Sequence, residues 1–134
     1  MDMQEVNART IVQFRAGGEI EGMHRERILL LTTTGRRSGE RRTTPMMFVG
    51  KDGRVLVIAS NVGAPRHPDW YLNLAADPNV TVEVSDETYE AVATTLEGAE
   101  RERDWAMVKQ LFPFFGHHES KTNRTIPVVE LTRA

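Results

Sequence analysis

The stretch Leu-Leu-Leu-Thr-Thr-Thr-Gly-Arg-Arg-Ser-Gly-Glu-Arg-Arg (29–42) decides how this chain begins to fold. The aliphatic and threonine run at 28–33 is typical of a strand, and residues 43–49 predict a second strand. The turn between them therefore joins two neighbouring strands of one sheet, which indicates hairpin connections rather than helical crossovers.

The turn itself combines glycine with positive charge. Glycine allows left-handed backbone conformations and close approach of a ligand, and exposed backbone N–H groups beside guanidinium groups suit phosphate or carboxylate. A solvated basic hairpin is the alternative interpretation. The residues concerned are Gly35, Gly39, Arg36, Arg37, Arg41 and Arg42.

Further strands and short helices follow at close spacing. The Gly-Lys-Asp-Gly sequence at 50–53 is a hairpin signal, and strands are expected at 54–60, 80–84, 88–96 and 126–131. Helices are expected within 1–22 (ending near Gly17-Gly18), from Pro68 to before Asp77, and at 100–112, with loops at 61–67 and 113–123. Six strands with two or three helices predict a mainly β chain with short helices, an antiparallel barrel with helical inserts.

The composition excludes several classes of protein. The chain has 134 residues, 40% of them hydrophobic, and no cysteine, which indicates one domain without disulfides, thiolate nucleophile or cysteine metal site. Residues 24–54 hold eight Lys/Arg against three acids, whereas 77–104 hold nine acids against two arginines. This asymmetry predicts a local site for a small polyanion and no nucleic-acid partner. The absence of an apolar span or signal peptide predicts a cytoplasmic address, and peripheral contact with the inner face of a membrane stays open.

Familiar catalytic motifs are missing. The chain has no phosphate-binding loop, dinucleotide fingerprint or serine elbow, and His117-His118 without spaced partners predicts no metal site. A basic turn, the small residues Ala59-Ser60, the helix start at 68–70 and nearby aromatic groups remain. These suit a planar cofactor with an anionic tail, although core packing is the alternative reading of the aromatic residues.

Several ordered motifs resemble one family. They are Thr-Thr-Thr-Gly-Arg-Arg-Ser-Gly (32–39), Thr44-Pro45, Ile-Ala-Ser (58–60), Pro-Asp-Trp-Tyr-Leu-Asn-Leu (68–74), Asp77-Pro78 and Arg-Thr-Ile-Pro-Val-Val (124–129). From about residue 28 to 131 the chain is similar to the deazaflavin-dependent nitroreductases and quinone reductases. The resemblance implies an antiparallel split β-barrel of the FMN-binding split-barrel type. It also implies an N-terminal helical segment at 1–27 and a cofactor-binding domain at 28–134, within a single domain overall.

The resemblance implies 8-hydroxy-5-deazaflavin coenzyme F420 as the cofactor and assigns residues to it. Arg36, Arg37, Ser38 and Gly39 would hold the phosphate, and Asp69 and Trp70 would cap the cofactor. Thr44, Pro45, Met47, Ala59 and Ser60 would line the deazaflavin. On electrostatic grounds, Arg41, Arg42 and Arg66 are expected to meet the carboxylates of the tail.

Where relatives carry substrate-facing tyrosines, this chain has Phe112, Phe115 and His118. These three are expected to form the substrate pocket, with His118 as the catalytic candidate for a hydrogen bond or a proton. The predicted activity is hydride transfer from reduced F420 to an electron-poor acceptor such as a quinone, enone or unsaturated lactone. Two alternatives stay open, an FMN-binding split-barrel oxidoreductase and a non-catalytic deazaflavin carrier. A homodimer also stays open.

Overall fold

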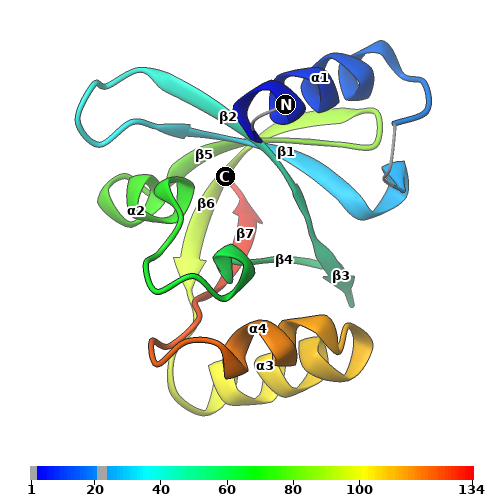
Figure 1. The fold of residues 1–134 in the computed structure, drawn as a ribbon. Helices are drawn as coiled ribbons and strands as arrows, with labels where there is room; N and C mark the ends of the chain where they lie inside the picture. Colours follow the sequence, from blue (N-terminus) through cyan, green and yellow to red (C-terminus); the bar gives the residue numbers. More distant parts are fainter. Residues whose placement is uncertain (1–2, 21–23) are drawn as a thin grey trace.

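The computed structural model describes residues 3–20 and 24–134, and these residues form one seven-stranded antiparallel sheet with four α-helices around it (Figure 1). The sheet order is β2-β1-β5-β6-β7-β4-β3, which curls into a half-barrel and confirms the predicted mainly β, split-barrel class. The strands are β1 (Ile28–Thr34), β2 (Arg41–Met47), β3 (Val49–Lys51), β4 (Arg54–Ile58), β5 (Asn79–Val84), β6 (Glu87–Thr95) and β7 (Val128–Arg133). The helices are α1 (Met3–Ala16), α2 (Asp69–Ala76), α3 (Gly98–Leu111) and α4 (Phe114–Ser120), with short 3₁₀ turns η1 (Arg25–Arg27) and η2 (Asn61–Gly63).

The curl of the sheet follows from its connectivity. Strands β2 and β3 stand at opposite ends of the strand order, yet Phe48 alone separates them in the chain. The two ends of the sheet must therefore lie close together, as they do in a barrel. Pro45 lies in β2, where its missing N–H is tolerated because β2 is an edge strand.

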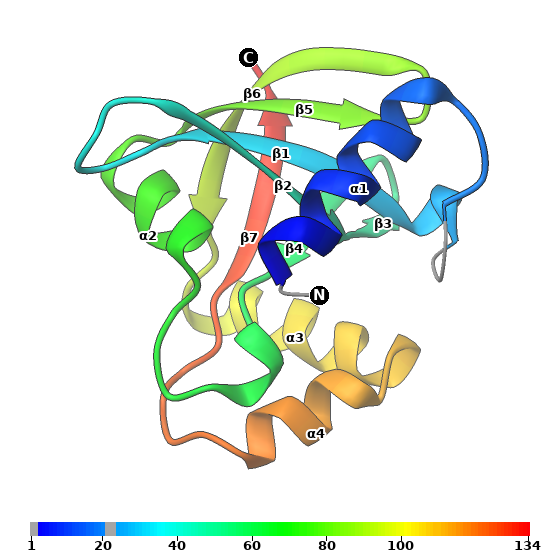
Figure 2. The same cartoon turned by 45° about the horizontal axis from the view of Figure 1, so that its top comes forward.

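Both faces of β1 are covered. Leu29 and Leu31 point into the barrel, where they join a core with residues of β4 to β7 and Leu74 of α2. Ile28 and Leu30 point outward and pack with Phe14 of α1 and with Ile20. The all-apolar start of β1 is thus explained by α1, which lies across the outside of the sheet (Figure 2).

A second core lies at the other end of the barrel, beneath α3 and α4. Trp105 of α3 and Phe115 of α4 pack against Leu56 and Val128 on the outer faces of β4 and β7. Figures 1 and 2 show α3 and α4 together on the side opposite α1. The sheet is therefore covered by helices at two places, by α1 on one side and by α3 with α4 on the other.

Three expectations were wrong in detail. The stretch 43–49 is not one strand, because the chain crosses from one sheet edge to the other at Phe48. The strand expected at 54–60 ends at Ile58, and residues 61–63 form η2. The loop expected at 113–123 contains α4, which Phe115 anchors in the core and Glu119 ties to α3 by accepting a hydrogen bond from the indole N–H of Trp105.

The N-terminal helix is confirmed and ends at Ala16, before Gly17 at φ +81°. Residues 1–2 and 21–22 of that expectation lie outside the described residues.

Candidate functional site

The basic turn between β1 and β2 is closed by its own backbone. The Gly35 N–H donates to the Glu40 carbonyl at 2.8 Å, and the Gly39 N–H donates to the Gly35 carbonyl at 2.9 Å. Gly39 adopts φ +72°, and a Cβ at Gly35 would come within 2.7 Å of the Ser38 hydroxyl oxygen. The left-handed φ favours glycine at position 39, whereas a larger residue at position 35 would force the Ser38 hydroxyl to move.

A buried amide from α2 fixes this turn to the barrel. The side-chain oxygen of Asn73 accepts hydrogen bonds from the Arg36 backbone N–H at 3.1 Å and from the Arg36 guanidinium at 2.9 Å. Asn73 is only 6% exposed, and its amide group also donates to Thr33 in β1. The Arg36 guanidinium further pairs with Asp69 at 3.3 Å. Sequence reasoning missed Asn73, whose one signal was a polar residue on the apolar side of α2.

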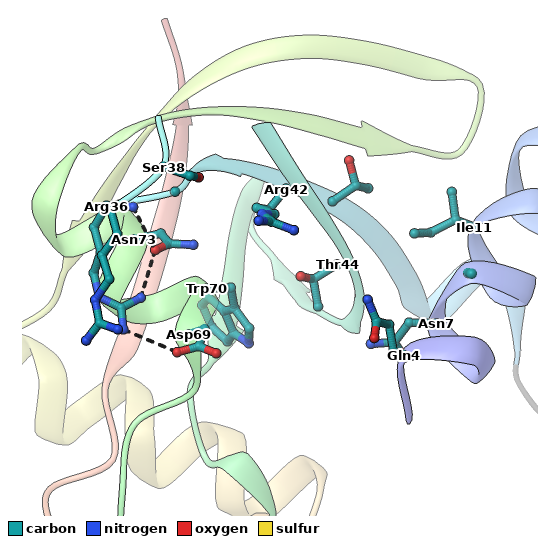
Figure 3. Close-up of a pocket in the computed structure, with 14 residues that line it drawn as sticks. Gln4, Asn7, Ile11, Arg36, Ser38, Arg42, Thr44, Asp69, Trp70 and Asn73 are labelled. Carbon is teal, nitrogen blue, oxygen red and sulfur yellow. Dashed lines mark hydrogen bonds and ion pairs between the residues drawn. The ribbon is translucent and has the colours of Figure 1, made fainter. Parts of the chain in front are cut away.

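The turn forms one wall of a cavity of about 650 Å³ (Figure 3). Trp70 and Asp69 at the start of α2 lie beside it, and α1 forms the opposite wall with Gln4, Asn7 and Ile11. The contribution of α1 was not foreseen. The complete lining is Gln4, Asn7, Ala8, Ile11, Gly35, Arg36, Arg37, Ser38, Arg42, Thr43, Thr44, Asp69, Trp70 and Asn73.

The predicted cationic residues separate into different environments. Arg37 lines the cavity, is exposed, and makes no hydrogen bond or ion pair within residues 3–20 and 24–134. Arg42 also lines it and lies 3.4 Å from Glu40. Arg41 points the other way, because neighbours in a strand face opposite sides, and its guanidinium donates to Thr34 and Thr81. Arg66 forms a 3.8 Å ion pair with Asp69 but, like Gly39 and Arg41, is not part of the lining.

A second, smaller cavity of about 270 Å³ lies further along β2. Pro45, Met46 and Met47 line it together with Phe112 and Phe114, and the other lining residues are His24, Arg27 and Ile28. Thr43 and Thr44 line the first cavity, so one strand passes from the polar cavity to the apolar one. Of the predicted substrate residues, the structure places Phe112 here and buries Phe115 in the core with Trp105.

His118 contacts Ser60, which follows β4, away from the two cavities. Ala59 is fully buried, Ser60 is 6% exposed, and neither lines the two cavities. Nδ1 of His118 lies 3.1 Å from the Ser60 hydroxyl, and its ring lies beside those of Phe114 and Phe115. Burial, together with the nearby Lys121, lowers the pKa of His118, so the imidazole is neutral at pH 7.

Within 3–20 and 24–134, no group of three His, Asp or Glu side chains is placed to hold a metal ion. None of the helices formed by these residues has both the length and the apolar character needed to span a bilayer.

Known proteins similar to this chain support a common fold and activity class. The sequence model of a family described as F420H(2)-dependent quinone reductase matches residues 4–133. A Mycobacterium tuberculosis protein named F420H(2)-dependent quinone reductase is 35% identical over 108 residues, covering 78% of this chain and 72% of that protein.

Solved structures give the same result. One titled as an F420-H2 dependent reductase (FDR-A) has a TM-score of 0.72 and 39% identity, covering 82% of this chain and 99% of its own. Another, described as a domain-swapped dimer, has a TM-score of 0.74 and 36% identity, covering 90% of this chain and 92% of its own. A haem storage protein of Vibrio cholerae, HutZ, has a TM-score of 0.64 at 18% identity and shares the fold alone.

Proposed function

The chain belongs to the F420H(2)-dependent quinone reductase family, and on that premise we propose that it transfers a hydride from reduced F420 to a small quinone-type acceptor. Enones and unsaturated lactones present the same electron-poor conjugated carbon and are proposed as further acceptors. The observation that carries this function is the pair of cavities joined by β2, one bordered by free positive charge and the other apolar.

The residues present fit a cofactor that has a planar ring and an anionic tail. In the first cavity, the unpaired guanidinium of Arg37, the Ser38 hydroxyl and Arg42 would hold the phosphate and tail carboxylates. Arg36, whose guanidinium already contacts Asn73 and Asp69, would act mainly by holding the turn. Thr44, Pro45 and Met47 would line the deazaflavin where β2 passes from one cavity to the other.

When bound, the reduced deazaflavin supplies the hydride, and the protein supplies binding, alignment and exclusion of water. Phe112, Phe114 and Met47 would offer an apolar surface to the acceptor. His118 is neutral, and its Nδ1 contacts the Ser60 hydroxyl. With its proton on Nε2, the imidazole can donate a hydrogen bond from that nitrogen. With its proton on Nδ1, it donates to Ser60, and the Ser60 hydroxyl can donate in turn. Its part in protonating the product stays a prediction.

Other parts of the chain have proposed roles as well. Helix α1, within the predicted N-terminal segment, would cover the cofactor tail, since Gln4, Asn7 and Ile11 face the basic turn across the cavity. The domain-swapped relative supports a homodimer as a proposal. The cytoplasmic address and the peripheral membrane contact remain predictions from sequence.

The direct test is to titrate the purified protein with F420 and, separately, with FMN by calorimetry. Reduced F420 is then mixed with a quinone, an enone and an unsaturated lactone while its oxidation is followed by absorbance. We expect binding of F420 and oxidation by the quinone. Binding of FMN in preference to F420 would favour the split-barrel flavin alternative, and tight F420 binding without oxidation by any acceptor would indicate a carrier.

A further inference from the structure

Arg124 begins the Arg-Thr-Ile-Pro-Val-Val motif and has no role in the function described so far. Every N–H of its guanidinium has an acceptor: the carbonyl of Ala64 at 3.0 Å, that of Ala59 twice at 3.2 Å, that of Ser60 at 2.7 Å, and Nδ1 of His67 at 2.9 Å. Because a guanidinium only donates, Nδ1 of His67 must accept, which leaves the proton of neutral His67 on Nε2. Burial and the Arg124 charge lower the pKa of His67, in agreement with a neutral imidazole.

The loop that Arg124 holds has an unfavourable backbone conformation. Three consecutive residues are left-handed: Asn61 at φ +49°, Val62 at φ +57° and Gly63 at φ +82°. A β-branched residue rarely adopts such a φ, and Val62 is 67% exposed, so burial of its side chain does not compensate. A conformation of this kind persists only where surrounding contacts impose it.

The same loop is pressed against α4. A Cβ added at Gly63 would come within 2.7 Å of the His118 carbonyl oxygen and 2.9 Å of Cβ of Lys121. The loop therefore contacts both Arg124 and the helix that carries His118. Figures 1 and 2 show this turn between the start of α2 and α4.

One end of the loop leads to His118, the catalytic candidate, and the other leads to the first cavity. At one end the hydroxyl of Ser60 contacts Nδ1 of His118. At the other end His67 packs on Tyr71, with ring centroids 5.0 Å apart, and is followed by Pro68, the residue that precedes α2. The next two residues, Asp69 and Trp70, line the cavity beside the basic turn.

We propose that Arg124 is a positioning residue, which holds the strained loop 59–67 so that Ser60 meets His118 and the start of α2 closes the cofactor cavity. This inference rests on the proposed function. It goes beyond that function in assigning the left-handed loop as the element whose conformation limits both cofactor binding and turnover. If only a fraction of the molecules hold the loop in this conformation, the apparent dissociation constant of F420 equals the intrinsic one divided by that fraction.

Two pairs of variants test the proposal, each with a matched control. Arg124→Lys removes most of the hydrogen-bond donors to the loop. Its control, Arg54→Lys, removes donors to Asp104 and Glu130, which lie outside the site. Gly63→Ala pushes the loop from α4, whereas Gly53→Ala, at φ +78° with nothing within 4 Å of the added Cβ, carries only the backbone penalty. For each variant the dissociation constant of F420, kcat and the thermal melting midpoint are measured.

We expect Arg124→Lys and Gly63→Ala to raise the F420 dissociation constant about five- to tenfold and to lower kcat, since a loop held in about a tenth of molecules weakens binding tenfold. Arg54→Lys and Gly53→Ala should lower the melting midpoint and leave both other quantities within twofold. Adding Val62→Gly to Arg124→Lys should recover at least half of the lost affinity, because glycine accepts the left-handed conformation.

Equal losses of affinity in each variant and its control would refute the proposal, as would a failure of Val62→Gly to recover any affinity. Should Arg124→Lys not fold, Gly63→Ala against Gly53→Ala decides the question on its own. A wild-type protein that binds no F420 would instead refute the proposed function, and that result is seen before any variant is made.

Discussion

Replacing Arg37 with alanine should weaken F420 binding without destabilising the fold, because its guanidinium lines the cavity and makes no contact within the described residues that folding would lose. Two neighbours on the same hairpin provide comparisons. Arg36→Ala removes a side chain that is tied to Asn73 and Asp69, and Arg41→Ala removes one that faces Thr34 and Thr81.

The magnitudes follow from these contacts. A charge-assisted hydrogen bond from Arg37 to phosphate contributes about 1.5–2 kcal/mol, so Arg37→Ala should raise the dissociation constant roughly 10- to 30-fold. Arg36→Ala loses one hydrogen bond and an exposed ion pair, whereas the Asn73 oxygen keeps its bond from the Arg36 backbone N–H. That loss is about 1 kcal/mol, or about 3–5 °C in the melting midpoint of a domain of this size. With both arginines replaced, the dissociation constant should rise at least tenfold.

Calorimetric titration at two salt concentrations separates the three residues. Arg37→Ala should lose affinity and also lose part of the salt dependence, because one screened charge is gone. Arg36→Ala should lower both affinity and melting midpoint, and Arg41→Ala should leave affinity within twofold. The reasoning is refuted if Arg41→Ala weakens binding as much as Arg37→Ala. The positive charge of the hairpin would then matter, and not the side of the hairpin on which each arginine lies.

Three further predictions concern single residues. Asn73→Leu should cost about 2 kcal/mol in the free energy of unfolding and weaken F420 binding, because the partly buried Arg36 N–H loses its acceptor; chemical denaturation and titration measure the two effects. His118→Phe should lower kcat more than F420 affinity. Because the pKa of His118 is lowered in the folded protein, wild-type stability should fall as pH drops below about 6.5, and this variant should lose part of that dependence; equal losses in kcat and affinity would make His118 structural. Asp104→Asn should destabilise the protein by about 2 kcal/mol at pH 7. The Arg54 hydrogen bonds lower the pKa of Asp104, so stability is lost as pH falls through that lowered value and the difference from wild type should shrink below about pH 4 in acid denaturation.

The strands could be predicted because their signals are local. Alternation along β5 and β6 and the Asp-Gly turn before β4 depend on neighbouring residues alone, and the barrel class followed from their number and spacing. The helix α4 could not be foreseen in the same way. Its sequence, with Gly116 and two histidines, has weak intrinsic preference, and it is helical because Phe115 packs against Trp105 from a different helix.

The candidate site was predicted as a set of residues but not as an arrangement. Arg41 and Arg42 are adjacent in β2, so strand alternation alone could have shown that only one faces the cavity. The wall from α1 depends on contacts between α1 and β2, and the anchor from Asn73 depends on a hydrogen bond to a residue 37 positions away. No periodicity reports such contacts, and a single amide in an apolar helix reads as surface until its partner is known.

The order of the strands also bears on how the protein is made. Strand β7 pairs with β6 on one side and β4 on the other, so it alone connects β2-β1-β5-β6 to β4-β3 in the ladder of the described sheet. The basic turn belongs to the first group, and the loop at 59–67 follows from the second. In the chain, the strands of both groups come before β7, and closure of the sheet requires pairings such as Val57 with Val129. Such late, long-range pairing slows folding. We therefore expect the parts of the sheet that border the two cavities to come together late in folding.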